Sequence, residues 1–138
     1  MRLELTKRAD YAIRTVLALA ATPPSERRSV RQVAADQMIP ASFLPLVMGD
    51  LVRAGLVDGA VGRRGGYCLA KPATRIMLLD VIEAVEGDSR RRVCVLRGGP
   101  CALDGVCAVH STFALAQDDV LRRLGTTSVA DAIARTGR

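Results

Sequence analysis

Two short segments of helical periodicity, separated by only a few residues, constrain the fold of this chain most strongly. The first is predicted over about Val30–Gln37. The second begins with Ser42 as its N-cap and ends near Ala54, before Gly55. Pro45 then falls at the third helical position, where a backbone amide has no partner within the helix. The alternative is a helix kinked at Pro45. Two helices joined so tightly are typical of a helix-turn-helix, whose second helix reads DNA.

The residues after this pattern predict a β-hairpin with a basic tip. Strands are expected at Leu56-Val57 and at Tyr67-Cys68-Leu69, on either side of Gly62-Arg63-Arg64-Gly65-Gly66. A hairpin in this position is typical of the wing of a winged helix, and arginines at its tip can enter a minor groove. The alternative for these two arginines is a solvated turn. Cys68 is interpreted as a small apolar residue of its strand.

Further helices are predicted on both sides of this pattern. Thr6 can cap a helix over 7–21, and an amphipathic helix over 78–86 is closed by Gly87. The fold class is therefore mainly α with a small β-wing, a winged helix-turn-helix domain followed by a long dimerisation helix. The expected divisions are a DNA-binding domain over 1–87, a cysteine loop over 88–107 and a dimerisation region over 108–138, against which the helix over 7–21 packs.

A long helix is predicted over 108–124, because apolar residues recur there at spacings of 4, 3, 4 and 4. They are Val109, Phe113, Ala116, Val120 and Leu124. Such a stripe can cover a core or form a two-helix seam, and a DNA reader of this size usually needs a twofold partner. We therefore expect a homodimer. Ser128, with Asp131 three residues later, starts a last short helix through Ala134.

The positive charge is concentrated in the first half of the chain. Residues 1–75 contain 12 Lys or Arg against 6 Asp or Glu, whereas residues 76–138 contain 8 of each, so the whole net charge of +6 lies before residue 76. This half also holds the helix-turn-helix and the wing, where positive charge favours phosphate binding. The expected partner is therefore double-stranded DNA.

Other classes of protein fit the composition less well. No run approaches the roughly 18 apolar residues of a membrane helix, and Met1-Arg2-Leu3-Glu4 is unlike a secretory signal, so we expect a cytoplasmic protein without membrane contact. One histidine and no evident paired carboxylates leave little for acid–base or nucleophilic catalysis. We expect neither an enzyme nor a small-molecule substrate.

Three cysteines and the sole histidine gather within 17 residues, as Cys94, Cys101, Cys107 and His110. In the cytosol thiols stay reduced, so clustered cysteines indicate ligands rather than disulfides. An iron–sulfur cluster is favoured by the loose spacing in a glycine-rich loop, whereas zinc sites usually use close cysteine pairs. Zinc and metal-free thiols sensing redox state remain alternatives.

The sequence resembles the IscR/NsrR-type winged-helix regulators, which are bacterial homodimeric repressors and activators carrying an iron–sulfur cluster. The resemblance covers nearly the whole chain. Besides the three cysteines, it rests on Leu5-Thr6-Lys7-Arg8-Ala9-Asp10-Tyr11-Ala12, Ile39-Pro40-Ala41-Ser42-Phe43-Leu44, Arg53-Ala54-Gly55-Leu56-Val57, Gly65-Gly66-Tyr67-Cys68-Leu69 and Val81-Ile82-Glu83-Ala84-Val85-Glu86-Gly87.

This resemblance implies that Cys94, Cys101 and Cys107 bind a 2Fe–2S or 4Fe–4S cluster. It offers two fourth ligands, His110 or an acidic residue contributed by the other subunit, to which Asp10 corresponds. It also implies that the cluster controls operator binding in response to redox state, nitric oxide or cluster supply. The alternative is a cluster-free regulator of the same fold that uses thiols or zinc.

Candidate DNA contacts complete the expectation. Ser42 and Gln32 are expected to contact bases or phosphate, and Arg31, Arg63 and Arg64 to contact phosphate or the minor groove. Pro45 stands where some proteins of the resembling family carry a polar base-contacting side chain, so we expect a base preference different from theirs.

Overall fold

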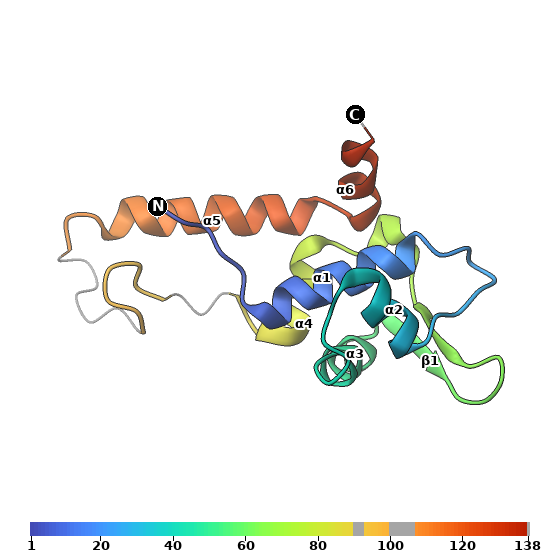
Figure 1. Cartoon of the computed structure of the whole chain (residues 1–138). Coiled ribbons are helices and arrows are strands. Elements are labelled where there is room, and N and C mark those ends of the chain that lie inside the picture. The colour runs from blue at the N-terminus through green and yellow to red at the C-terminus, as the bar shows by residue number, and fades with distance from the viewer. Residues whose placement is uncertain (90–92, 100–106, 138) are drawn as a thin grey trace.

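The structure is a computed structural model that describes residues 1–89, 93–99 and 107–137 (Figure 1). The described elements form a mainly helical fold with one two-stranded antiparallel sheet, as predicted. In chain order they are α1 (Lys7–Ala20), α2 (Val30–Gln37), α3 (Leu44–Arg53), β1 (Val57–Ala60), β2 (Gly66–Leu69), the 3-10 turn η1 (Ala73–Arg75), α4 (Leu78–Glu86), α5 (His110–Thr126) and α6 (Val129–Thr136).

Helix α1 lies at the centre of the core. Thr6 caps it, since the Thr6 hydroxyl oxygen accepts a hydrogen bond from the backbone N–H of Ala9 at 3.2 Å. The apolar face of α1 packs against α2, α3, α4, β2 and α6. The largest fully buried side chains of this core are Leu44, Met48, Leu51, Ile76, Val16, Val33, Val47, Val81 and Val129.

The helix-turn-helix consists of α2, a tight turn and α3. Met38 ends α2 in the left-handed conformation with φ of 53°, and the buried side chain of Ile39 follows it. The prediction that Ser42 caps α3 is wrong, because residues 40–43 close a separate turn in which the N–H of Phe43 donates to the carbonyl of Pro40 at 3.0 Å. Phe43 is the N-cap, and Pro45 lies in the first turn as expected.

The wing is the predicted hairpin, with β1 and β2 paired from Val57–Leu69 to Ala60–Gly66. The segment before α2 joins it as a third, shorter partner. The N–H of Arg28 donates to the carbonyl of Tyr67 at 2.9 Å, and the N–H of Tyr67 donates to the carbonyl of Arg28 at 2.8 Å. The wing is therefore hydrogen-bonded to the segment that leads into the helix-turn-helix.

Helix α5 extends away from the body of the fold (Figure 1), and none of its residues is buried. It starts at His110, two residues later than predicted, because residues 108–109 form a turn without a side-chain cap. Its last turn returns to the body, where the N–H of Leu78 donates to the carbonyl of Thr127 at 3.0 Å and the N–H of Val129 donates to that of Ile76 at 2.8 Å. None of the helices in the described ranges is long and apolar enough to cross a membrane.

Candidate DNA-binding face and cysteine site

The predicted DNA contacts all lie at exposed positions. Arg31 and Gln32 stand in the first turn of α2, Ser42 in the turn before α3, and Arg63 and Arg64 at the tip of the wing. Among the residues that the structure describes, none of these three arginines belongs to an ion pair. Their charges are therefore not neutralised within the described fold and can face phosphate oxygens.

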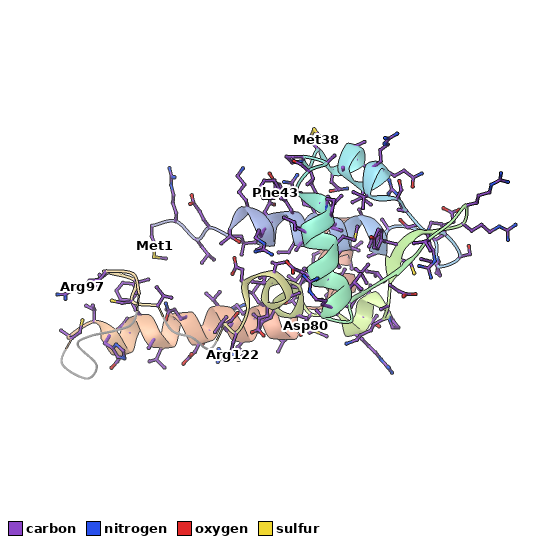
Figure 2. All side chains as sticks on the ribbon, turned by 90° about the horizontal axis from the view of Figure 1, so that it is seen from below. Met1, Met38, Phe43, Asp80, Arg97 and Arg122 are labelled. Carbon is purple, nitrogen blue, oxygen red and sulfur yellow. The ribbon has the colours of Figure 1, made fainter. Side chains whose placement is uncertain are left out.

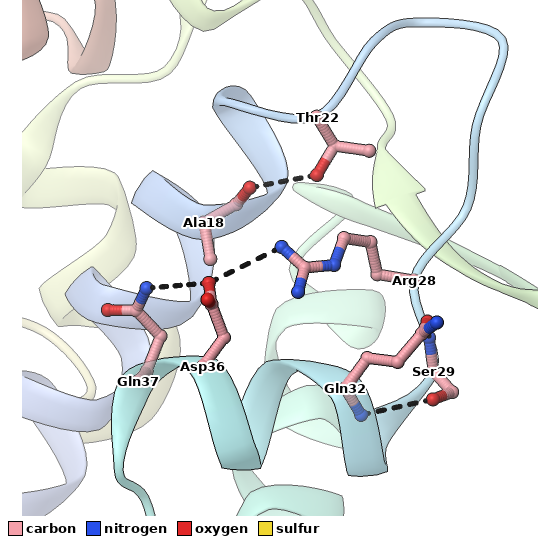
Figure 3. A network of polar contacts seen from close by, with 7 residues as sticks. All are labelled: Ala18, Thr22, Arg28, Ser29, Gln32, Asp36 and Gln37. Carbon is pink, nitrogen blue, oxygen red and sulfur yellow. Dashed lines mark hydrogen bonds and ion pairs between the residues drawn. The ribbon is translucent and has the colours of Figure 1, made fainter.

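Gln32 has a structural role in addition to its predicted contact. Its side-chain oxygen accepts a hydrogen bond from the N–H of Ser29 at 2.9 Å, and the Ser29 hydroxyl accepts one from the N–H of Gln32 at 3.1 Å, the second of which Figure 3 draws. This capping box satisfies the start of α2 and fixes the side chain. The side-chain nitrogen of Gln32, Nε2, remains as a donor for a contact with DNA.

The face of α3 opposite the core is formed by residues spaced 3 and 4 apart, namely Leu46, Gly49 and Arg53, and Ser42 precedes it in the turn before α3. The core side of α3 holds the buried Leu44, Val47, Met48 and Leu51. Leu46 is 65% exposed. The surface that α3 offers to a partner is thus the isobutyl group of Leu46 and the guanidinium of Arg53, with the hydroxyl of Ser42 in the preceding turn.

Asp50 fixes the charged end of this face. Its carboxylate, only 14% exposed, is paired with both Arg8 of α1 and Arg53 of α3. A Cβ at Gly49 would lie 3.3 Å from the Arg53 guanidinium, so that group lies over Gly49. Arg8, Asp50 and Arg53 therefore form one network that joins α1 to the exposed face of α3.

Arg27 holds the wing in place. Its guanidinium donates to the Asp58 carboxylate at 3.0 Å, to the Asp58 carbonyl at 3.2 Å and to the Gly66 carbonyl at 3.3 Å. Arg28 pairs with Asp36 of α2 at 3.4 Å (Figure 3). Two of the basic residues near the helix-turn-helix thus position the wing within the protein.

Asp10, one candidate fourth ligand, lies on α1 in a bidentate pair with Arg14. Arg14 donates from Nη2 at 2.6 Å and from Nε at 3.2 Å, and its other terminal nitrogen donates to the carbonyl of Gln37 at 2.7 Å. The Arg14 guanidinium also lies over the Tyr11 ring, 5.2 Å from its centroid. Asp10 is therefore connected to the last carbonyl of α2.

Cys94, Cys107 and His110 line one small pocket of about 40 Å³. Its other walls are apolar except for Gln117 of α5, and include Val95, Leu96, Val109 and Phe113. The predicted ligand Cys101 lies outside the described residues. The structure thus brings two of the three predicted cysteines and the histidine to a single place, beside the first turn of α5.

Hydrogen bonds hold the loop that carries Cys94 against α5. The N–H of Cys94 donates to the carbonyl of Gly99, and the N–H of Gly98 donates to that of Cys94, both at 2.8 Å, so residues 94–99 close a tight loop. The Gln117 side chain donates to the carbonyl of Val93 at 3.1 Å and holds this loop against α5. Arg97 lies near the α5 end of the molecule in Figure 2.

Comparison with known proteins decides the family. The profile of the Rrf2 family, described as iron-dependent transcriptional regulator, matches residues 5–135. The chain belongs to the Rrf2 family. Among its relatives, the HTH-type transcriptional regulator NsrR of Geobacillus kaustophilus is 28% identical over 130 residues, which cover 94% of this chain and 88% of that protein. The resemblance to NsrR-type and IscR-type regulators is thereby confirmed.

Solved structures confirm the fold of this Rrf2 protein. CymR (YrzC), the global cysteine regulator of B. subtilis, is similar with a TM-score of 0.82 at 24% identity, covering 97% of this chain and 98% of that one. IscR of T. potens is similar with a TM-score of 0.78 at 21% identity, covering 97% and 88%. At these identities the likeness shows a shared winged-helix fold.

The donor set can be tested against the cluster that the family resemblance implies. Two thiols and an imidazole are the soft and borderline ligands that iron–sulfur clusters use, so their chemistry fits. In the described ranges, however, no three donor residues are placed close enough to hold one metal ion. The pocket has room for about three waters at roughly 10–15 Å³ each. Cluster binding would therefore require Cys101 and a wider pocket.

Several residues of the candidate sites escape sequence reasoning. Arg27, Gln117 and Arg14 act through partners 31, 24 and 23 residues away along the chain, and no local pattern announces such contacts. Leu46 and Arg53 were detectable, since they stand opposite the apolar face of a predicted helix.

Proposed function

We propose that this Rrf2-family regulator is a homodimer whose operator binding is controlled by an iron–sulfur cluster held by Cys94, Cys101 and Cys107. The fourth ligand is His110 or Asp10 of the partner subunit. The observation that carries the proposal is the convergence of Cys94, Cys107 and His110 on one pocket. Membership of a family described as iron-dependent supports the same chemistry.

DNA binding is proposed for the surface formed by α3 and the wing. A helix-turn-helix places the N-terminal residues of its second helix against base edges in the major groove. The exposed Arg63 and Arg64 then reach the flanking minor groove or its phosphates. The positive charge of residues 1–75 supports this arrangement, because sequence-independent affinity for DNA comes from neutralised phosphates.

Dimerisation is proposed through α5. The helix has no buried residue in a single chain, and its predicted apolar stripe is exposed at the N-cap Val109 and at Ala116 and half-buried at Phe113. A second copy of the same helix would cover them in a two-helix seam. Two DNA-binding faces would then stand at a fixed spacing, as an operator with twofold symmetry requires.

When bound, an iron–sulfur cluster supplies a redox-active centre whose potential depends on hydrogen bonding and solvent exposure. The chain contributes the connections from that site to the DNA-binding face. Cys94 lies in the loop that the Gln117 side chain holds against α5. The chain segment that leads to this loop follows α4, and Glu86 in the last turn of α4 accepts a hydrogen bond from Thr6, the N-cap of α1. Helix α4 packs on both α1 and α3.

Ligation of the cysteines would therefore restrain α4 relative to α5, and α4 contacts the reading helix. A useful coupling between the two sites needs about 1–3 kcal/mol, which corresponds to about a 5- to 150-fold change in DNA affinity. That is of the same order as a few hydrogen bonds.

The second candidate is a regulator of the same fold that senses through its thiols without a metal. The small volume of the pocket that Cys94 and Cys107 line favours it. In that case Cys94 and Cys107, which line the same pocket, would reduce a peroxide to water by two electrons and two protons and form a disulfide. The zinc version is a variant of this candidate.

Anaerobic purification distinguishes these candidates. We expect an absorption band at about 400 nm with matched iron and acid-labile sulfide. Single alanine variants of Cys94, Cys101 and Cys107 should lose it, whereas Cys68→Ala, in the wing strand, is the matched control and should retain it. A colourless protein that cannot be reconstituted, yet loses DNA affinity on mild oxidation, would support the thiol candidate.

The fourth ligand is tested in the same preparation. His110→Ala and Asp10→Ala are compared by cluster content and by the rate at which oxygen bleaches the absorption band. Loss of the cluster in one variant alone assigns the ligand. Fluorescence anisotropy with a selected operator duplex, with and without the cluster, then measures the coupling, and equal affinities in the two states would contradict control by the cluster.

A further inference from the structure

The outward face of α3 is apolar where DNA-reading helices can carry polar side chains. Leu46 occupies the third position of α3 and is 65% exposed, beside the exposed Pro45. Neither side chain has a hydrogen-bond donor or acceptor. The next residue on that face, Gly49, offers no side chain at all.

We propose that Leu46 is a specificity-determining residue that reads the 5-methyl group of a thymine in the major groove. The inference deepens the proposed function and rests on α3 being the reading helix. The position is suitable, because a recognition helix brings its N-terminal residues to the base edges. The chemistry is suitable as well, since the thymine methyl is the apolar group that a base pair presents in the major groove.

The neighbours of Leu46 on this face place a positive charge beside it. Gly49 lies three residues further along the same face, where the missing side chain leaves room for the Arg53 guanidinium. Arg53, four residues beyond, is held down over Gly49 by its pair with Asp50. Its guanidinium thereby lies only about 5 Å from Leu46 along the helix, the rise of three residues at about 1.5 Å each, where it can pair with a phosphate beside the contacted base.

Two further apolar side chains are exposed around the turn between α2 and α3, near the outward face of α3. Met38, at the left-handed end of α2, is 87% exposed, and Phe43, the N-cap of α3, is also exposed while its ring packs edge-on against Tyr11. Figure 2 shows Met38 and Phe43 at the same end of the helix-turn-helix. Apolar groups exposed on one functional surface mark a contact that removes them from water.

The test uses the full-length chain and an operator duplex selected from a randomised pool. Each thymine is replaced in turn by deoxyuridine, which lacks only the methyl group. For the unaltered protein we expect one thymine position in each half-site to be sensitive. A single replacement at that position should weaken binding about fourfold, equivalent to about 0.8 kcal/mol for one buried methyl group.

Leu46→Ala should bind the thymine and deoxyuridine duplexes equally, because the contacting side chain is gone. Leu46→Met keeps an apolar side chain and should retain the preference. Leu3→Ala, which removes a leucine that is 80% exposed outside the helix-turn-helix, is the matched control and should behave as the unaltered protein.

Indifference of the unaltered protein to deoxyuridine at every position would overturn the inference. So would a Leu46→Ala variant with the same deoxyuridine penalty, since the effect would then come from DNA shape alone. Recovery of no duplex from the pool is a different failure, because it would remove the proposed DNA-binding function itself. All variants lie at exposed positions, and circular dichroism checks that their helix content is unchanged.

Discussion

Gly66 is the residue on which the attachment of the wing most depends. Its φ of +115° is rarely adopted by other residues, and a Cβ there would lie 2.9 Å from the carbonyl oxygen of Arg28 and 3.0 Å from its carbon. Gly66→Ala would therefore cost about 1–3 kcal/mol in backbone strain. It would also push Arg28 away from Tyr67, weakening two hydrogen bonds worth about 0.5–1.5 kcal/mol each.

The expected loss for Gly66→Ala is about 2–6 kcal/mol in the free energy of unfolding, measured by urea denaturation with linear extrapolation. Gly62→Ala separates the two causes. Gly62 has a similar φ of +101° but nothing within 4 Å of its Cβ position, so only the strain of about 1–3 kcal/mol applies. Faster hydrogen exchange at the Tyr67 amide should accompany Gly66→Ala alone. Equal losses in the two variants, within about 0.5 kcal/mol, would refute the role of the Arg28 contact.

Further predictions concern DNA binding and stability. Replacing Arg63 and Arg64 together by Ala should weaken operator binding and reduce the slope of log affinity against log salt by about 1–2, measured by anisotropy; an unchanged slope removes the wing from the interface. Ser128→Ala should destabilise the fold by about 1 kcal/mol in thermal or urea unfolding, through loss of the α6 cap. Hydrogen bonds with the Ser128 side chain and backbone hold the pKa of Asp131 below its ordinary 3.8, so the stability it contributes is complete above that value and is lost as pH falls through the lowered pKa; acid titration of Asp131→Asn should lack this component. Thr15→Val should raise stability by about 1 kcal/mol, because the Thr15 hydroxyl is buried and has no hydrogen-bond partner among the described residues.

The parts of the fold that local chemistry determines were predictable from the sequence. The spacing of apolar residues and the caps Ser29, Thr6 and Ser128 place the helix starts, and the predicted bounds of α2 and α4 match the structure. Errors occur where a helix begins without a capping side chain. Both α3, with Phe43 as N-cap, and α5 start later than predicted, because no side-chain hydrogen bond marks their first turn.

The candidate sites were predictable as sets of residues but not as arrangements. Spacing alone indicated a ligand group, yet it could not show that Cys94 and His110 line the same pocket across the intervening loop. The pair of Asp10 with Arg14 lies within α1 at i,i+4 spacing, but the hydrogen bond from Arg14 to Gln37 depends on how α1 packs against α2, which spacing could not show. Tertiary packing decides which partners a side chain meets.

Helix α5 is attached to the body of the fold at one end, so a displacement at its other end is transmitted along its whole length. One end is fixed to the body by two backbone hydrogen bonds, from Leu78 to Thr127 and from Val129 to Ile76, while Cys107 and His110 stand at the other. Its 17 residues span about 25 Å, so a tilt of about 5° moves the cysteine end by about 2 Å. A small force at the thiols therefore acts over the full length of α5 and produces a torque on residues 76–78, where α4 begins.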